Sequence, residues 1–178
     1  MAEIERRDLL LALIAAGPQP RLSGIDLSGL DLSHLDLRGA SLHGADLSNC
    51  ILNRTDLENC DLTRANLTEA DLSHARLRKA KLQHAILFKA KLDDADLHAA
   101  DCSHALLKDA SLRDASAAEL FLKDADLRGM QAHKADLRGA NFSGANWEGA
   151  CFEGAYLTGA INPPGGGVSS SLVRAVRR

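Results

Sequence analysis

The sequence predicts an all-β solenoid, and three observations lead to that fold class. From Ile25 to Gly159 the chain repeats one five-residue pattern without insertion or deletion: a small apolar residue, usually Asp or Asn, Leu, then two polar residues. Steps of five from Leu27 to Leu157 give 27 pentapeptides, of which 21 have Leu at the centre and 19 have Ala two residues earlier. The 178 residues are 46% apolar and 3% aromatic, which suits a narrow interior of Leu and Ala.

A period of five fits neither an α-helix nor a straight strand. At about 100° per residue, successive leucines of a helix would advance by about 140° and spiral around its axis. In a strand, residues an odd number apart point to opposite faces. The pattern therefore requires a corner within every pentapeptide, with Ala and Leu inward and Asp outward. Coils of this kind stack as a β-helix, and each buries its apolar atoms against its neighbours.

The repeats resemble the pentapeptide-repeat family, whose pattern A(D/N)LXX is matched by residues 65–69, 95–97 and 135–139, among many. The resemblance covers about three quarters of the chain. It implies a right-handed quadrilateral β-helix with four sides to each coil. Twenty residues per coil would give about seven coils over residues 22–162, and a rise of about 4.8 Å per coil would give a rod roughly 30 to 35 Å long.

Residues 1–17 are predicted to form a short capping helix that covers the N-terminal end of the solenoid. Apolar residues recur there at helical spacing, and Gly17 and Pro18 end the helix. A signal peptide is the alternative, but acidic residues near the start contradict its positive n-region. The first coil has large residues at small-residue positions, Ile25, Leu30 and Leu35, which would fill the floor where no preceding coil exists.

At the other end, three successive centres are aromatic. We expect Phe142, Trp147 and Phe152 to plug the core, and a binding cage is the alternative. Residues 163–178 begin with a Pro- and Gly-rich linker and continue as a short basic tail. The sequence leaves three alternatives open for this tail: a lid, a contact with a second subunit, or disorder.

Glycine at the last pentapeptide position predicts the corners. It occupies that position at Gly24, Gly29, Gly39 and Gly44, and again from Gly129 onwards, whereas the middle coils have larger residues there. Type II turns need a positive φ at this position, which Gly adopts at the lowest cost. We therefore expect type II corners near the two ends and different corners in the middle.

Charge and motifs argue against several function classes. Residues 22–162 contain 15 Lys or Arg and 21 Asp or Glu, and this acidic balance does not favour nonspecific nucleic-acid binding. The polar residues lie outward on a convex rod, where no pocket excludes water, and the repeated Asp is suited to accept backbone hydrogen bonds near the turn. No Gly-rich phosphate loop, CxxC pair or zinc-spaced His pair occurs. We expect no enzyme activity, no cofactor, and neither nucleic acid nor a membrane as partner.

The histidines are candidate metal ligands, and the cysteines are candidates for a disulfide bridge. His84 and His104 share one column of the coils, with Asp124 next, so a metal site is the alternative to solvated surface histidines. Cys50 and Cys60 occupy inward positions half a coil apart, which places them at opposite corners and predicts no bridge. Cys102 takes a central position and Cys151 an outward one. Four unpaired thiols predict a reducing, cytoplasmic location.

Two departures on the outer surface form the candidate interaction patch. Ile86 and Leu106 take the outward place of Asp on the same side of adjacent coils, with Phe88 close by. A basic girdle without acidic residues surrounds the same coil and consists of Arg76, Arg78, Lys79, Lys81, Lys89 and Lys91. Scattered surface hydrophobes with lysines for solubility are the alternative interpretation.

Two functions follow from these features. The first is a non-enzymatic scaffold that binds an unidentified protein partner on its solenoid faces. The second is implied by the resemblance, because some pentapeptide-repeat proteins mimic B-form DNA and modulate DNA gyrase or other type II topoisomerases. A mimic of that type would be expected to form a homodimer through its C-terminal end. The acidic column expected for such a mimic is interrupted here, since it runs Asp36, Asp56, Arg76, Asp96, Ser116, Asp136.

Overall fold

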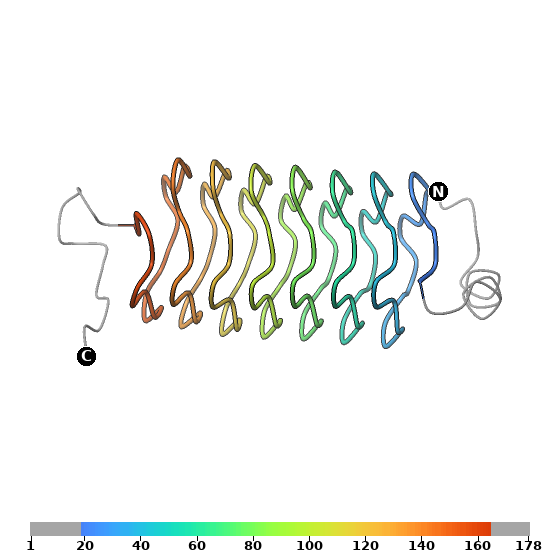
Figure 1. The fold of residues 1–178 in the computed structure, drawn as a ribbon, viewed down its shortest axis with the longest axis horizontal. Coiled ribbons are helices and arrows are strands. Elements are labelled where there is room, and N and C mark those ends of the chain that lie inside the picture. The colour runs from blue at the N-terminus through green and yellow to red at the C-terminus, as the bar shows by residue number, and fades with distance from the viewer. Residues whose placement is uncertain (1–18, 165–178) are drawn as a thin grey trace.

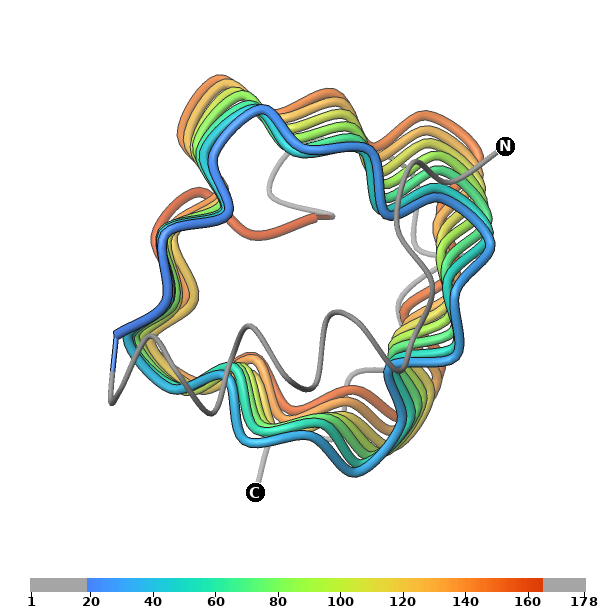
Figure 2. The same cartoon turned by 90° about the vertical axis from the view of Figure 1, so that its right-hand side faces the viewer.

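The computed structural model describes residues 19–164, which form a β-helix of stacked coils (Figure 1) with four sides to each coil (Figure 2). Every parallel bridge joins a residue to the residue twenty positions later, from Arg21–Ser41 at one end to Asn141–Ile161 at the other. One coil therefore takes four pentapeptides, and the coils superimpose when they are viewed along the axis (Figure 2). Residues 19–164 contain no strand longer than one bridge residue and no helix, hence none that could cross a membrane.

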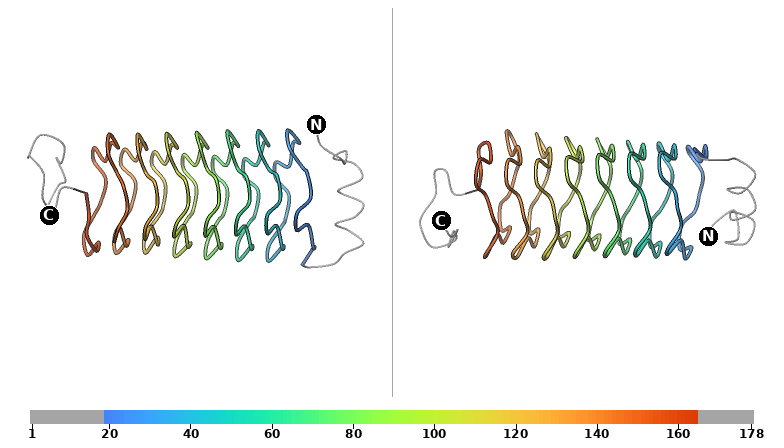
Figure 3. Two further views of the ribbon diagram at one scale, coloured as in Figure 1. Left: turned by 90° about the horizontal axis from the view of Figure 1, so that it is seen from above. Right: turned by 60° about the horizontal axis from the view of Figure 1, so that its bottom comes forward.

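Backbone hydrogen bonds explain why the coil repeats every twenty residues. The outward Asp46 donates its N–H to the Ile25 carbonyl at 2.9 Å, and its own carbonyl accepts the Leu27 N–H at 2.8 Å. Within a corner, the Leu30 N–H donates to the Leu27 carbonyl at 3.2 Å. The same pattern recurs along the rod, so each coil is bonded to the coils on both sides. Figure 3 shows the coils stacked next to one another along the rod.

The outward Asp or Asn closes a turn at its own corner. Its side-chain oxygen accepts the backbone N–H two residues later, as in Ser28 N–H to Asp26 at 2.9 Å and Thr68 N–H to Asn66 at 3.2 Å. This bond occurs at fourteen pentapeptides within residues 19–164. The predicted structural role of the repeated Asp is confirmed: it caps an N–H that the coils leave unpaired.

The corners contradict the difference expected between the ends and the middle. Every last-position residue of a pentapeptide from Gly24 to Gly159 has a positive φ, with values of 55–61° for the non-glycine residues and 64–74° for the glycines. The premise that larger residues would avoid this conformation is wrong. The N–H of each last-position residue must point along the rod to reach the next coil, as the Asn49 N–H does when it donates to the Thr68 carbonyl at 2.9 Å. Inter-coil bonding therefore imposes left-handed backbone on Lys, Glu and Ala alike.

This strain gives a stability prediction in one column of corners. Ala99 has a φ of 55° without a polar side chain to compensate. Ala99→Gly removes a Cβ clash of about 1–2 kcal/mol, which the greater freedom of unfolded Gly offsets by about 0.4–1 kcal/mol. We expect the free energy of unfolding, measured by urea denaturation, to rise by roughly 0.5–1 kcal/mol.

The matched control is the reverse change in the same column. Gly139 has a φ of 70°, and an added Cβ would meet the Glu119 side chain at an ordinary 3.6 Å, so space is available. Gly139→Ala should therefore lower stability through the backbone alone. Equal signs for the two variants would contradict the strain argument.

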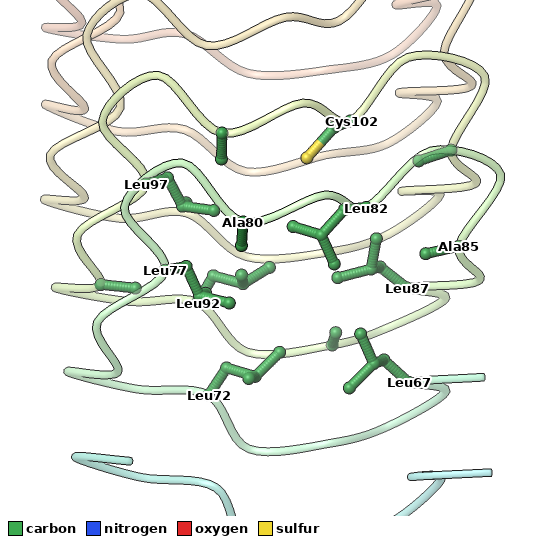
Figure 4. Close-up of a cluster of buried hydrophobic side chains, with 14 of the residues drawn as sticks. Leu67, Leu72, Leu77, Ala80, Leu82, Ala85, Leu87, Leu92, Leu97 and Cys102 are labelled. Carbon is green, nitrogen blue, oxygen red and sulfur yellow. The ribbon is translucent and has the colours of Figure 1, made fainter. Parts of the chain in front are cut away.

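The core is a stack of Leu and Ala side chains. The Leu centres and Ala positions from Leu37 to Ala140 are buried almost without exception, and Figure 4 shows Leu77, Leu82 and Leu87 converging from three sides of one coil. Three small-position residues add polar contacts to this core. Cys50, Thr55 and Cys60 donate to carbonyls of the preceding coil at 3.0, 2.8 and 2.7 Å, which allows Thr55 to be fully buried.

The two ends depart from the Leu and Ala pattern as the sequence predicted. Ile25, Leu30 and Leu35 are half-buried and pack against the core at the N-terminal end. Phe142 and Phe152 are buried at the other end, with ring centroids 5.9 Å apart in an edge-to-face arrangement, and Trp147 packs beside them. The capping helix expected at 1–17, the linker from 165 and the tail with its dimer contact lie outside the described residues.

Candidate interaction surface

The structure brings the two outward hydrophobes together. Ile86 and Leu106 form a bridge pair on one side of adjacent coils, and their exposed fractions are 38% and 46%. Asn66 and Asp126 precede and follow them in the same column. Ile51 is equally exposed, at 44%, but it is bridged to Asp31 and Asp71 on another side of the rod. Ile86 and Leu106 are therefore adjacent hydrophobes, whereas Ile51 stands between two carboxylates.

Aromatic groups continue this pair onto both neighbouring corners. At the preceding corner the imidazoles of His84 and His104 stack, with centroids 4.9 Å apart and planes 7° from parallel. At the following corner Phe88 is half-buried, and Lys89 Nζ lies 5.1 Å from its ring centroid. We call these five side chains the apolar strip: His84, His104, Ile86, Leu106 and Phe88.

The stacked histidines and Asp124 do not form a group of three converging metal ligands. Parallel rings one coil apart direct their in-plane nitrogens side by side, and His104 Nδ1 is 4.0 Å from Asp124 Oδ2. The ligand atoms of His84, His104 and Asp124 are not among those that converge within residues 19–164. The imidazoles instead extend the apolar strip beyond Ile86, Leu106 and Phe88, the three residues that the sequence predicts for it.

The basic girdle is divided among all four sides of the rod. Arg76, with Arg78 and Lys79 at its corner, lies on the side opposite Ile86, while Lys81 and Lys91 lie on the two flanking sides. Only Lys89 adjoins the apolar strip directly, and Lys108 occupies the corresponding corner of the next coil. The nine predicted patch residues therefore do not form one surface: Arg76, Arg78 and Lys79 are separated from it.

Arginines neutralise the acidic column that faces away from the apolar strip. Arg38 is 2.6 Å from Asp36 and Arg138 is 2.6 Å from Asp136, and these hydrogen-bonded guanidinium groups hold the pKa of each carboxyl below its usual value. Arg76 approaches Asp56 at 3.0 Å. Arg78 and Asp96 form a further pair at 3.1 Å. This side therefore presents alternating charges rather than a row of free carboxylates.

The apolar strip lacks the turn hydrogen bond that fourteen pentapeptides of residues 19–164 have. In the same column, Asp46 caps the Ser48 N–H at 2.9 Å two coils before Ile86, and Asp126 caps the Arg128 N–H at 3.2 Å one coil after Leu106. Ile86 and Leu106 have no side-chain acceptor, so they cannot cap Phe88 and Lys108. Two adjacent pentapeptides have thus lost the turn bond while gaining exposed apolar surface.

Comparison with known proteins places these features in a family. The sequence profile for pentapeptide repeats matches in eight copies, over residues 21–59, 50–88, 90–129 and 135–161. No curated protein matches the chain. HetL, a pentapeptide-repeat protein involved in heterocyst differentiation regulation in the cyanobacterium Nostoc, is 31% identical over 94% of this chain and 100% of that chain, with a TM-score of 0.40.

Solved structures share the architecture at lower identity. A trypsin-treated form of QnrB1, a plasmid-mediated fluoroquinolone resistance protein, is 21% identical with a TM-score of 0.77, over 88% of this chain and 81% of that chain. A second trypsin-treated form is 22% identical with a TM-score of 0.54, over 79% and 76%. This likeness shows the fold, which in these proteins is a right-handed quadrilateral β-helix. The chain belongs to the pentapeptide-repeat family.

Proposed function

We propose that this pentapeptide-repeat scaffold is non-enzymatic and binds a protein partner through the apolar strip. The main observation in support of this proposal is the bridge pair Ile86–Leu106, where two stacked positions have exposed hydrophobes in place of the turn-capping Asp. Sites where a sequence breaks its own structural rule are expected to be functional. Asp at either position would not destabilise the fold, so stability alone does not explain why these two residues are hydrophobic.

The surroundings of the strip define the chemistry of its partner. Lys89 and Lys108 follow it at one corner, and Lys81 lies on the flanking side. Lys89 is 3.8 Å from Glu69, whereas neither Lys81 nor Lys108 has an ion pair within residues 19–164. An apolar centre with a lysine rim favours a partner surface that carries an apolar ridge between acidic residues.

The partner-binding test compares one chemical change at two places. Ile86→Asp combined with Leu106→Asp places charge in the strip, and we expect partner affinity to fall at least about thirtyfold, as for a central interface residue. Ile51→Asp makes the same change on another side and should leave affinity unchanged. Proteins captured by the wild type from a cell extract are identified, purified, and titrated against all three chains.

The outcomes of this comparison separate the strip from the rest of the rod. Loss of binding only in the double variant supports the proposal. Equal binding by all three chains would remove the strip as the docking site, and equal loss in the Ile51→Asp control would show a charge effect independent of position.

A DNA-mimicking modulator of DNA gyrase is the second candidate, and it rests on the family resemblance. The side whose column should imitate phosphates carries Arg76, and its carboxylates are paired with arginines, as for Asp36 and Arg38 at 2.6 Å. We therefore expect purified protein to leave gyrase supercoiling unchanged, with and without a fluoroquinolone. Inhibition or drug protection at stoichiometric concentration would reverse the order of the two candidates.

A further inference from the structure

Three metal-ligating side chains meet on the outer surface of the last coils. His133 lies at a corner of one coil, and Cys151 and Glu153 belong to the next coil. His133 Nε2 is 3.4 Å from Cys151 Sγ and 3.8 Å from Glu153 Oε2. The three ligand atoms lie within 4.8 Å of one another, and no other His, Cys, Asp or Glu group of this kind occurs within residues 19–164.

The distances match the edges of a small tetrahedral site. With Zn–S of about 2.3 Å and Zn–N or Zn–O of about 2.0–2.1 Å, a tetrahedron places sulfur and nitrogen about 3.6 Å apart and nitrogen and oxygen about 3.4 Å apart. The observed separations are 3.4 and 3.8 Å. A thiolate and a carboxylate together balance a charge of +2, and the sulfur selects zinc-class ions over calcium or magnesium.

The backbone holds the ligands in register before any ion binds. The Ala132 N–H donates to the Cys151 carbonyl at 2.8 Å, and the Lys134 N–H donates to the Glu153 carbonyl at 2.9 Å. These bonds flank His133 and join both ligand-bearing segments. The Nδ1 atom of His133 is buried and has no hydrogen-bond partner, so Nε2 is the nitrogen available to a ligand. Glu153, with 77% of its side chain exposed, has room to adjust.

We propose that His133, Cys151 and Glu153 bind one zinc-class divalent metal ion, with water as the fourth ligand. Three protein ligands and an open position describe this group better than a closed structural site. The ion would link two successive coils near the aromatic end of the core. It does not depend on the apolar strip, which lies on another side of the rod.

Cobalt titration of the full chain tests the thiolate directly. Tetrahedral Co²⁺ should bind at one equivalent with a thiolate-to-cobalt charge-transfer band, and Zn²⁺ should displace it. Cys151→Ser should abolish the band. Cys151→Ser or His133→Asn should weaken Zn²⁺ binding by at least about tenfold to a hundredfold, which is the loss caused by removing a residue that only orients a ligand. The His84→Asn/His104→Asn variant is the control and should bind as the wild type. Circular dichroism of each variant establishes that it is folded.

Thiol alkylation gives a second readout. Burial raises the pKa of Cys50 to about 11 and those of Cys60 and Cys102 to about 12, so these three thiols stay protonated inside the core. Iodoacetamide should therefore modify Cys151 in the native protein, and Zn²⁺ should slow that modification. Unchanged Zn²⁺ affinity in Cys151→Ser, Co²⁺ binding without the thiolate band, or loss of binding in the His84/His104 control would each overturn the proposal.

Discussion

Leu107→Ala is expected to lower the free energy of unfolding by about 2–5 kcal/mol, whereas Leu106→Ala should change it by less than about 0.5 kcal/mol. The two residues are neighbours in the chain, but 1% of Leu107 and 46% of Leu106 is exposed. Leu107 lies in the core column between Leu87 and Leu127. Truncation of the Leu107 side chain leaves a cavity that these leucines cannot fill, because their backbones are bonded to the coils on either side.

Urea unfolding followed by far-ultraviolet circular dichroism measures both changes. The slope of the free energy against urea concentration should stay constant, since each variant exposes the same surface on unfolding. Because a solenoid coil contacts only its two neighbours, a defect in a middle coil weakens interfaces on both of its sides. Similar decreases in the free energy of unfolding for Leu106→Ala and Leu107→Ala would contradict the assignment of Leu107 to the core and of Leu106 to the surface.

Much of the fold was predictable because one physical rule governs most residues. A corner in every pentapeptide explains the buried Leu at each centre, the outward Asp and the large or aromatic residues at both ends. The left-handed corners were not predictable from residue preference. Lys79 and Glu69 have φ values of 55° and 58° although neither residue favours them, because inter-coil hydrogen bonding outweighs a local cost of about 1–2 kcal/mol.

The candidate sites were only partly predictable, for a geometric reason. Column membership follows from steps of twenty, which correctly paired Ile86 with Leu106 and His84 with His104. Corner residues also reach the outward residue eighteen positions later. The pairs Arg78–Asp96, Gln83–Asp101 and His133–Cys151 all have this spacing. Applying steps of eighteen and twenty together would have assembled His133, Cys151 and Glu153 from the sequence.

Restoring the repeat at the apolar strip should stabilise the rod while weakening partner binding. Ile86→Asp and Leu106→Asp each supply an acceptor for the N–H two residues later, as Asp46 does for Ser48 at 2.9 Å. Each cap should add about 0.5–1 kcal/mol to the free energy of unfolding. Ile86→Ala and Leu106→Ala remove the same exposed side chains without a cap and should give no gain.

This combination distinguishes a functional surface from a structural one. If Ile86 and Leu106 served the fold, Asp would destabilise the rod at least as much as Ala does. If they serve a partner, the Asp variants become more stable than the wild type in urea unfolding and lose affinity in the same preparation. Ile86→Asp alone avoids the repulsion of two carboxylates placed opposite each other on neighbouring coils, because its column neighbours are Asn66 and Leu106, whereas Leu106→Asp faces Asp126. A gain in stability with unchanged affinity would leave the exposed pair without a function, and a loss of stability in both Asp variants would make it part of the fold.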